Sequence, residues 1–449
     1  MKMMIRTKGV ALALWLVAIG GATMSAQQNN KGYYKDLFVD GGISLTSRAD
    51  LPAAETLGMS LEAFLCSPHK GKDTTAYNAA DTLFERTLLG GYVYDENGIL
   101  LYPDGAPRFR MIFMNGGSAN AHGKSLGSEA RNAIRDFVRA GGSYVGSCAG
   151  MFIGSKGVKG DSLVKYTANY LGVWPGYTIS TGVIKNRMDL VIEKKAAILK
   201  YADFGGDHRV DSVYHNGGGF AVTNVDWPEG TEILARYDIK GRTDLKPSRD
   251  IQMQPAIWAW KENDQTGRVI LCGSHPEFVK DGERRDLEQS MFQYAMEGNG
   301  LPTLKGELLS GQTRLMYCTT ADRTPAFTCI GDRQYHHFAL QVPKDAGRVT
   351  VTLKPKPGWG DFDLYLMGTY DEFAYLDNAE YKSTEPGATQ TLTIENPRRG
   401  TLYLSVFCNT TVDTVETKWG TQYTGRLDVL NGVPYGITAI CTPKETAQP

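Results

Sequence analysis

The sequence lacks an excess of charge of either sign. Its 48 Lys and Arg residues almost balance its 49 Asp and Glu residues, and the formal net charge at pH 7 is −1. A nucleic-acid-binding protein needs surplus cations to neutralise phosphates, so this composition argues against a nucleic-acid partner. No internal repeat or low-complexity tract is present either, and about two-fifths of the residues are hydrophobic (42%). The chain therefore has the composition of an ordinary globular protein.

Long apolar runs are absent after the N-terminus. Basic residues near the start precede an apolar stretch over 10–19, which is shorter than the roughly 20 residues of a membrane-spanning helix. Small residues follow as far as Ala26. This pattern predicts a leader over 1–26 that is cleaved after Ala26, with an uncleaved anchor as the alternative. We therefore expect an exported protein, periplasmic or extracellular, with no transmembrane segment once the leader is removed.

Cysteines are few, and their number is odd. In an oxidising compartment cysteines tend to pair, and the clustering of four of them after residue 300 makes Cys318–Cys329 and Cys408–Cys441 plausible disulfides. An odd count leaves at least one free thiol, for which Cys148 is the candidate. The seven positions are Cys66, Cys148, Cys272, Cys318, Cys329, Cys408 and Cys441.

Two structural units are expected, because 449 residues exceed what one core usually serves. Residues 27–300 alternate between predicted strands and helices, the helices falling over 51–64, 128–142 and 283–296. Such alternation predicts an α/β fold with a doubly wound, mostly parallel, flavodoxin-like sheet covered on both faces. Functional residues of such folds gather at the carboxyl ends of the strands.

The remainder of the chain, 305–449, has a different pattern. Hydrophobic residues alternate with polar ones at Val349, Val351 and Leu353 and again at 402–406, and Gly and Pro turns separate these runs. This period of two predicts an all-β sandwich. The boundary between the units is expected within 298–306.

The stretch GGSYVGSCAGMFIGS, 141–155, places Cys148 between Gly146 and Gly150. A strand-like segment precedes it and an apolar segment follows it. A tight strand–turn–helix connection would expose the thiol at the sheet edge, with a helix N-terminus behind it, and the glycines would leave room for the turn. The alternative is a buried structural cysteine in a glycine-rich turn.

Two further segments follow predicted strands. CGSHPEF brings His275 and Glu277 together beyond the strand at 269–271; an imidazole could serve as the base for a thiol, and a carboxylate could fix its tautomer. MNGGSAN contains Gly116 and Gly117, and the N–H of Gly117 could form an oxyanion hole together with that of Ala149. The alternatives are a polar surface loop and an ordinary glycine turn.

Together these three motifs resemble the class I glutamine amidotransferase-like superfamily. The stretches DLFVDGGIS, GGSYVGSCAGMF and YHNGGGF are similar, in finer detail, to its biotin-protein ligase N-terminal domain branch. The resemblance covers roughly 34–300. It implies that Cys148, His275 and Glu277 form a catalytic triad and that Gly117 and Ala149 form an oxyanion hole.

Substrate contacts are implied less directly. Gly116, and also Tyr214 and Asn216 on the YHNGGGF loop, are candidates for lining the pocket, although glycine-rich turn chemistry explains that loop equally simply. Cys272 lies three residues before His275. It is a buried strand residue, a disulfide partner of Cys66, or a second thiol that perturbs the site.

The expected function is an exported cysteine-dependent hydrolase that cleaves a C–N amide or peptide bond of a small-molecule or peptide substrate through an acyl-thioester. No ammonia-accepting synthetase unit and no Gly-x-Gly-Arg-Gly stretch of a ligase is present. We therefore expect neither glutamine use nor biotin transfer, and no cofactor or metal. The alternatives are a non-catalytic binding protein that keeps this fold and a structural envelope protein.

The C-terminal unit resembles the bacterial pre-peptidase C-terminal domain, a β-sandwich appended to secreted hydrolases. YHHFALQVP, RVTVTLKPKPGWGDFDLYLMG and GTLYLSVFC carry this resemblance, which implies contact with a cell surface or polysaccharide. Asp361 and Asp363 are either calcium ligands or solvent-facing acids. His336 and His337 lack partners at metal-ligand spacing and are expected on the surface.

Overall fold

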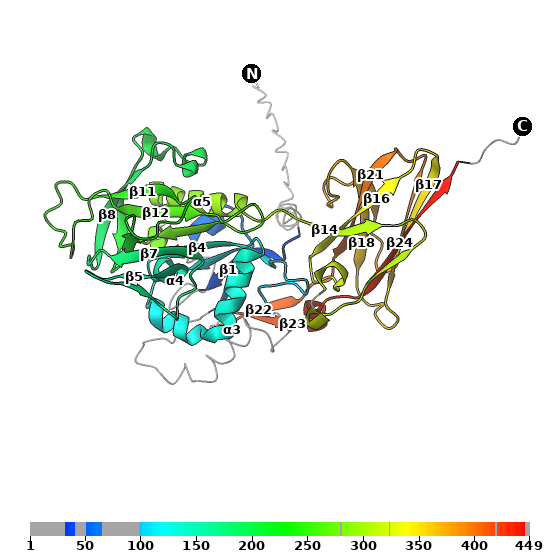
Figure 1. The fold of residues 1–449 in the computed structure, drawn as a ribbon, viewed down its shortest axis with the longest axis horizontal. Coiled ribbons are helices and arrows are strands. Elements are labelled where there is room, and N and C mark those ends of the chain that lie inside the picture. The colour runs from blue at the N-terminus through cyan, green and yellow to red at the C-terminus, as the bar shows by residue number, and fades with distance from the viewer. Residues whose placement is uncertain are drawn as a thin grey trace, which may run out of the picture.

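The computed structural model describes residues 32–40, 51–64, 98–278, 281–322, 324–417 and 420–444. The predicted leader over 1–26 and Cys66 lie outside these residues. Figure 1 shows an N-terminal unit of mixed sheets and helices joined to a C-terminal unit built of strands. Within the described ranges, no helix is both long enough and apolar enough to cross a bilayer.

An 11-stranded sheet forms the centre of the first unit, in the order β22-β23-β2-β1-β3-β4-β13-β12-β11-β8-β9. The strands from β2 to β13 in this order pair in parallel. Met114, Gly146 and the β13 residue Leu271 are aligned by these pairings, so the carboxyl ends of three adjacent strands lie at one edge. The parallel strands are β1 (Lys35–Asp40), β2 (Leu61–Phe64), β3 (Phe109–Met114), β4 (Ser143–Ser147) and β13 (Val269–Cys272).

The other half of the sheet is antiparallel, and the prediction of a mostly parallel sheet is wrong. Every pairing from β13 to β9 runs antiparallel. Parallel neighbours need a long crossover, usually a helix, and the segments that join these strands contain no α-helix, only short 3-10 turns, a three-residue strand at Gly219–Ala221 and irregular chain. The strands of this half are β8 (Asn186–Ile192), β9 (Arg209–His215), β11 (Glu232–Asp238) and β12 (Pro255–Trp260).

Helices cover both faces of the parallel half. Helix α3 (Ala119–Arg139) packs its buried residues, among them Ile134 and Phe137, on one face together with Ile112. Helices α1 (Pro52–Thr56) and α5 (Gly282–Glu297) pack against each other on the opposite face, where Phe113 contacts Phe292. The predicted helices near 128–142 and 283–296 are confirmed.

The predicted helix over 51–64 is wrong for most of its length. Helix α1 covers only Pro52–Thr56, and Gly58 follows with a φ of +63°, a left-handed conformation that glycine adopts without strain. The chain then becomes extended as β2, which pairs with β1. Apolar spacing that looked helical therefore belongs to a short helix and a buried strand.

A smaller sheet in the order β10-β7-β5-β6 lies beside the first. It contains β5 (Ser155–Lys159), β6 (Val164–Tyr166), β7 (Trp174–Ser180) and β10 (Gly219–Ala221), and the short helix α4 (Ala149–Gly154) leads into it. Short 3-10 helices lie at Ala197–Lys200, Phe204–Gly206, Pro276–Phe278, Thr320–Asp322, Pro325–Phe327 and Leu427–Asn431.

The C-terminal unit consists of two sheets with an apolar layer between them. Val349, Val351 and Leu353 are completely buried, as their alternation with polar residues predicts. One sheet contains β14 (Leu304–Leu308), β16 (Tyr335–Val342), β21 (Gly400–Cys408), β18 (Leu364–Tyr370) and β19 (Tyr381–Ser383); the other contains β15 (Thr313–Met316), β24 (Tyr435–Pro443), β17 (Ala346–Pro355) and β20 (Gln390–Glu395).

His336 and His337 are buried, which corrects the expectation of a surface position. Each ring has a hydroxyl partner from a strand that is distant in the sequence. His336 Nδ1 lies 2.9 Å from the Tyr435 hydroxyl, and His337 Nδ1 lies 2.7 Å from Ser405 Oγ. Burial lowers the pKa of His337 to about 3, so this ring is neutral at pH 7. In the same unit, Asp363 Oδ1 accepts the N–H of Gly387 at 2.7 Å.

The six described cysteines all carry free thiols, so the two plausible disulfides are not formed. Cys408 is completely buried at the end of β21, and its thiol donates to the Thr410 carbonyl at 3.5 Å. Cys441 lies on β24 in the opposite sheet. Cys318 and Cys329 are neighbours, since the N–H of Cys329 donates to the carbonyl of Cys318 at 2.9 Å.

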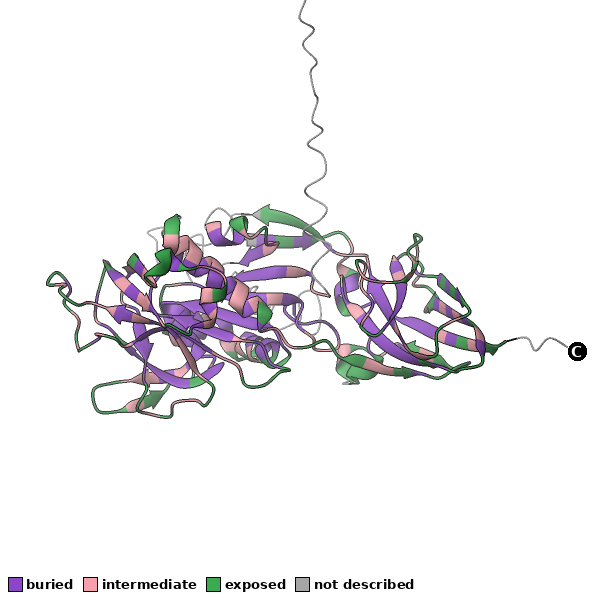
Figure 2. Cartoon of the chain, turned by 90° about the horizontal axis from the view of Figure 1, so that it is seen from above, coloured by how far each residue is buried: buried purple, intermediate pink, exposed green. Residues whose placement is uncertain are grey.

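The two units share structure. The hairpin of β22 (Asp413–Thr417) and β23 (Gly420–Thr424) leaves the C-terminal unit and pairs with the edge of β2 in the large sheet (Figure 1). Next to it Arg108 forms a buried, bidentate ion pair with Asp332, at 2.8 and 2.7 Å, and donates to the Tyr423 hydroxyl. Figure 2 shows buried residues running through the strands of both units.

Candidate active site

Cys148 occupies the turn between β4 and α4, in a backbone conformation with φ +48° and ψ −104°. A non-glycine residue held at positive φ costs about 1–2 kcal/mol, so the surrounding contacts must enforce this turn. The N–H of Cys148 donates to the Cys272 carbonyl at 2.9 Å. A Cβ on Gly146 would lie 2.4 Å from the Gly150 carbonyl oxygen, and one on Gly150 would lie 1.9 Å from that of Met114. Both glycines are therefore required by close packing around the turn.

His275 follows β13, the parallel neighbour of β4, so it reaches the same sheet edge as Cys148. The backbone N–H of His275 donates to the Tyr214 carbonyl at 2.8 Å, and its ring Nδ1 lies 2.8 Å from Glu277 Oε1. Ser147 Oγ donates to that same carboxylate oxygen at 2.8 Å. Cys148, His275 and Glu277 are 5%, 4% and 2% exposed, so the three groups are packed together away from bulk water.

The pKa of His275 is raised from its usual 6.5 to about 10. Burial alone would lower it, but the Glu277 carboxylate and hydrogen bonds to Cys148 and Glu277 outweigh that effect. The ring is therefore an imidazolium at neutral pH. It lies in contact with a thiol on one side and a carboxylate on the other, an arrangement that can transfer a proton to and from sulfur.

Gly116 and Gly117 follow β3 and border the histidine. A Cβ on Gly116 would lie 2.2 Å from His275 Cε1, so only glycine allows the ring its position. Gly117 has a φ of +139°. Within the described residues, neither the backbone N–H of Gly117 nor that of Ala149 donates a hydrogen bond. These two groups remain available to a carbonyl oxygen of a bound molecule.

Tyr214 lies against the ring of His275, and Asn216 lies against the thiol of Cys148. The Tyr214 ring is 5.7 Å from the His275 ring, centroid to centroid, and Phe278 packs on both rings. The thiol of Cys148 points to the carbonyl of Asn216 at 3.6 Å. The structure thus brings together every residue that the sequence singles out for this site.

Some nearby polar residues were not predicted. His215 is held between Thr181 Oγ1, at 2.7 Å, and Ser274 Oγ, at 2.9 Å; burial and then the charge of His275 lower its pKa to about 3. Glu288 on α5 is buried, and among the described residues neither of its carboxyl oxygens has a hydrogen-bond partner. Ser147 could have been noticed as the polar neighbour of Cys148, whereas His215 and Glu288 carry no local sequence signal.

Cys272 is a completely buried residue of β13, as the simplest prediction had it. Its thiol donates to the Ser274 carbonyl at 3.4 Å, and burial raises its pKa well above the usual range. This thiol therefore stays protonated. Across the described residues, no three His, Cys, Asp or Glu side chains gather in a way that could hold a metal ion.

Comparison with known proteins identifies relatives of the first unit. Residues 105–298 match the family described as biotin-protein ligase, N terminal. The biotin–protein ligase of Schizosaccharomyces pombe is 24% identical over 224 residues, which cover 46% of this chain and 32% of the ligase. An uncharacterized protein of Chlamydia muridarum is 26% identical over 194 residues, covering 39% of this chain and 64% of that protein.

The chain thus spans about a third of the yeast ligase and just under two-thirds of the chlamydial protein. Among solved structures, a glutamine amidotransferase is similar with a TM-score of 0.33 and 15% identity, over 58% of this chain and 98% of that one. The family match covers the cysteine turn, both glycines and the histidine–glutamate pair. The predicted resemblance to the biotin-protein ligase N-terminal domain is confirmed over residues 105–298.

Proposed function

We propose that the first unit is a cysteine-dependent hydrolase that cleaves a C–N amide or peptide bond. The observation that carries this proposal is the position of His275, whose Nδ1 lies 2.8 Å from Glu277 Oε1 and whose pKa is raised by both Glu277 and Cys148. A thiol is a useful nucleophile when a neighbouring cation stabilises its thiolate, and the imidazolium of His275 is such a cation. The family relationship fits a hydrolase or a ligase-like role.

The reaction has two stages. The Cys148 thiolate attacks the carbonyl carbon, and the oxygen takes up negative charge facing the N–H groups of Gly117 and Ala149. The C–N bond then breaks, the imidazolium of His275 protonates the departing amine, and an acyl-thioester remains. Water attacks the thioester while His275 accepts its proton, and the C–S bond breaks, which releases a carboxylic acid and returns the thiolate–imidazolium pair.

Glu277 supports both stages without touching the substrate. Its Oε1 receives hydrogen bonds from Ser147 and from the Nδ1–H of His275, which leaves the Nε2 of the ring for proton transfer. The hydrolase would act after export, as the leader-like residues at the N-terminus predict.

A thiol-directed acylating probe, read out by mass spectrometry, and hydrolysis of a panel of amides together test the proposal. Cys148→Ala should abolish labelling at this site and all turnover, while a far-ultraviolet circular dichroism spectrum reports an intact fold. Cys441→Ala is the matched control, because this half-buried cysteine lies on β24 of the other unit. Turnover that survives in Cys148→Ala would refute the mechanism, and labelling of Cys148 without any turnover would favour the non-catalytic binding protein.

A further inference from the structure

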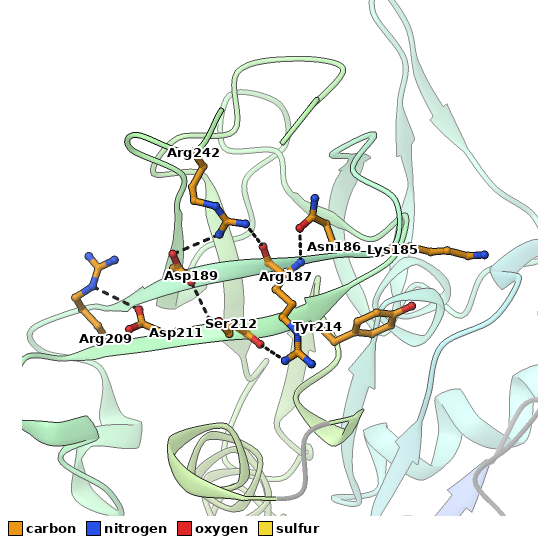
Figure 3. Close-up of a pocket in the computed structure, with 9 residues that line it drawn as sticks. All are labelled: Lys185, Asn186, Arg187, Asp189, Arg209, Asp211, Ser212, Tyr214 and Arg242. Carbon is orange, nitrogen blue, oxygen red and sulfur yellow. Dashed lines mark hydrogen bonds and ion pairs between the residues drawn. The ribbon is translucent and has the colours of Figure 1, made fainter. Parts of the chain in front are cut away.

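A charged groove of about 770 Å³ opens beside the candidate active site (Figure 3). It runs over the paired strands β8 and β9 at the antiparallel end of the large sheet. Its lining includes four cations, Lys185, Arg187, Arg209 and Arg242. Only two carboxylates, those of Asp189 and Asp211, accompany them in the lining. The surface of the groove therefore carries an excess of positive charge.

Two of the four cations are already neutralised by the protein. Arg242 binds both carboxylate oxygens of Asp244 at 2.8 Å and also approaches Asp189 at 3.5 Å. Arg209 donates to Asp238 at 2.6 Å. Both arginines therefore hold loops and strands in place and have little charge left for a ligand.

The other two cations have no carboxylate partner within the described part of the chain. Arg187 donates once, from Nη1 to the Ser212 carbonyl at 3.1 Å, and this contact fixes the guanidinium while its remaining N–H groups stay available. Lys185 is exposed, and it forms no ion pair with any residue that the structure describes. Unpaired cations in a concave surface concentrate positive potential, and arginine pairs well with planar carboxylates.

This unpaired end of the groove contains Tyr214, which connects it to His275. Arg187 lies directly opposite Tyr214 in the β8–β9 pairing, and the Tyr214 ring packs on the His275 ring. In Figure 3 the Lys185 side chain and the Tyr214 ring extend to the same side, away from Arg209 and Asp211.

A second path of contacts leads through Asn216. Its side-chain oxygen accepts the N–H of Lys185 at 3.2 Å, and its carbonyl oxygen lies 3.6 Å from the sulfur of Cys148. Lys185 has a φ of +46°, a strained conformation for lysine. The hydrogen bond that Lys185 donates to Asn216 helps hold this backbone, so Asn216 contacts both the backbone of Lys185 and the thiol of Cys148.

We infer that Lys185 and Arg187 bind a carboxylate of the substrate, so that the site takes amides with an anionic group close to the scissile bond. This inference rests on the proposed hydrolase and specifies its substrate class. The carboxylate is either the side chain of an acidic residue or the free C-terminus of a short peptide, since both present the same planar anion. Tyr214 would separate this anion from the reacting groups and orient the chain between them.

The test uses small chloroacetyl reagents, in which the Cys148 thiolate displaces chloride and forms a thioether. Four reagents separate the two carboxylate sources: N-chloroacetyl derivatives of glutamate, glutamate α-amide, glutamine and glutamine α-amide. The rate of Cys148 alkylation is measured by mass spectrometry for each. A charge-assisted hydrogen bond contributes enough to predict a rate ratio of roughly 10–100 between the preferred acid and the neutral reagent.

The variants Arg187→Gln and Lys185→Gln should bring this ratio close to one by slowing the alkylation of Cys148 by the acidic reagents. Arg187→Lys should restore part of the preference, because it keeps the charge. Lys354→Gln, an exposed lysine of β17 in the other unit, is the control and should keep the wild-type ratio.

The outcomes separate the two proposals. Equal rates for all four reagents in the wild type, with Cys148 still reactive, would overturn the carboxylate site and leave the hydrolase standing. An unreactive Cys148 together with turnover that survives Cys148→Ala would overturn the hydrolase itself. A preference that persists in both Arg187→Gln and Lys185→Gln would also overturn the site.

Discussion

Replacing Glu277 by Gln gives a direct measure of the electrostatics on which the proposed chemistry depends. The pKa of His275 is about 10 rather than 6.5 because the carboxylate and the contact with Cys148 outweigh the effect of burial. At about 1.36 kcal/mol per pKa unit, this difference corresponds to roughly 5 kcal/mol in favour of the imidazolium. Without the charge of Glu277, burial should dominate and the ring should become neutral near pH 7.

The expected effect depends on pH in a defined direction. A histidine whose pKa is raised by folding stabilises the folded state fully below its unfolded-state pKa of about 6.5, and this contribution is lost as the pH rises through about 10. Glu277→Gln should therefore lower the free energy of unfolding by about 2–4 kcal/mol at pH 6 and by less than about 1 kcal/mol near pH 10.5.

Urea unfolding of the wild type and Glu277→Gln at these two pH values measures the difference. Glu395→Gln is a suitable control, because Glu395 forms an exposed ion pair with Arg348 and should contribute no more than about 1 kcal/mol at either pH. The pH dependence of Cys148 alkylation gives a second measurement. Its transition at alkaline pH should lie at about pH 10 in the wild type and at a lower pH in Glu277→Gln. An equal loss of stability at pH 6 and pH 10.5 would refute the reasoning.

Three further substitutions probe the site and its support. Gly116→Ala places a Cβ where His275 Cε1 now lies, at 2.2 Å, and should reduce Cys148 alkylation by at least about 100-fold, whereas Gly360→Ala meets no atom within 4 Å and should have no effect. Arg108→Met leaves Asp332 buried without its partner and should cost about 3–5 kcal/mol in thermal unfolding, against less than about 1 kcal/mol for Arg348→Met. Glu288 is buried without hydrogen-bond partners, and burial followed by the charge of Glu277 raises its pKa; the unfolded chain releases this proton above about pH 4.5, so Glu288→Gln should stabilise the protein more at pH 8 than at pH 4. A stability difference for Glu288→Gln that does not change with pH would contradict this assignment.

The grouping of these side chains at one sheet edge could be predicted from the sequence because its determinants are local. The requirement for glycine at 146 and 150 follows from the sharp turn around Cys148, and the close approach of both glycines to carbonyl oxygens is observed. His275 and Glu277 are two residues apart, so one short loop orients both groups. Each motif follows a strand, and adjacent parallel strands bring their carboxyl ends to the same edge.

Features that depend on contacts between segments far apart in the sequence could not be predicted. A buried strand has the same apolar pattern in a parallel as in an antiparallel pairing, so the direction of β8, β9, β11 and β12 was not visible in the sequence. His336 and His337 look like surface residues until Tyr435 and Ser405, from other strands, supply their hydrogen bonds. The β22–β23 hairpin pairs with β2 more than 300 residues away in the chain, as the register of Phe64 with Gly420 shows.

The change in strand direction at β13 also explains how one sheet combines the turn that holds Cys148 with a charged groove. On one side β13 is parallel to β4, and this pairing brings His275 and Cys148 to one edge. On the other side it begins the antiparallel series that ends in β8 and β9. The end of β9 then returns to the loop after β13, where the backbones of Tyr214 and His275 pair. A fully parallel sheet would have carried β8 and β9 away behind crossover helices. The antiparallel half instead brings Lys185 and Arg187 alongside the reacting groups, so the departure from the predicted fold is what creates the groove that we assign to the substrate.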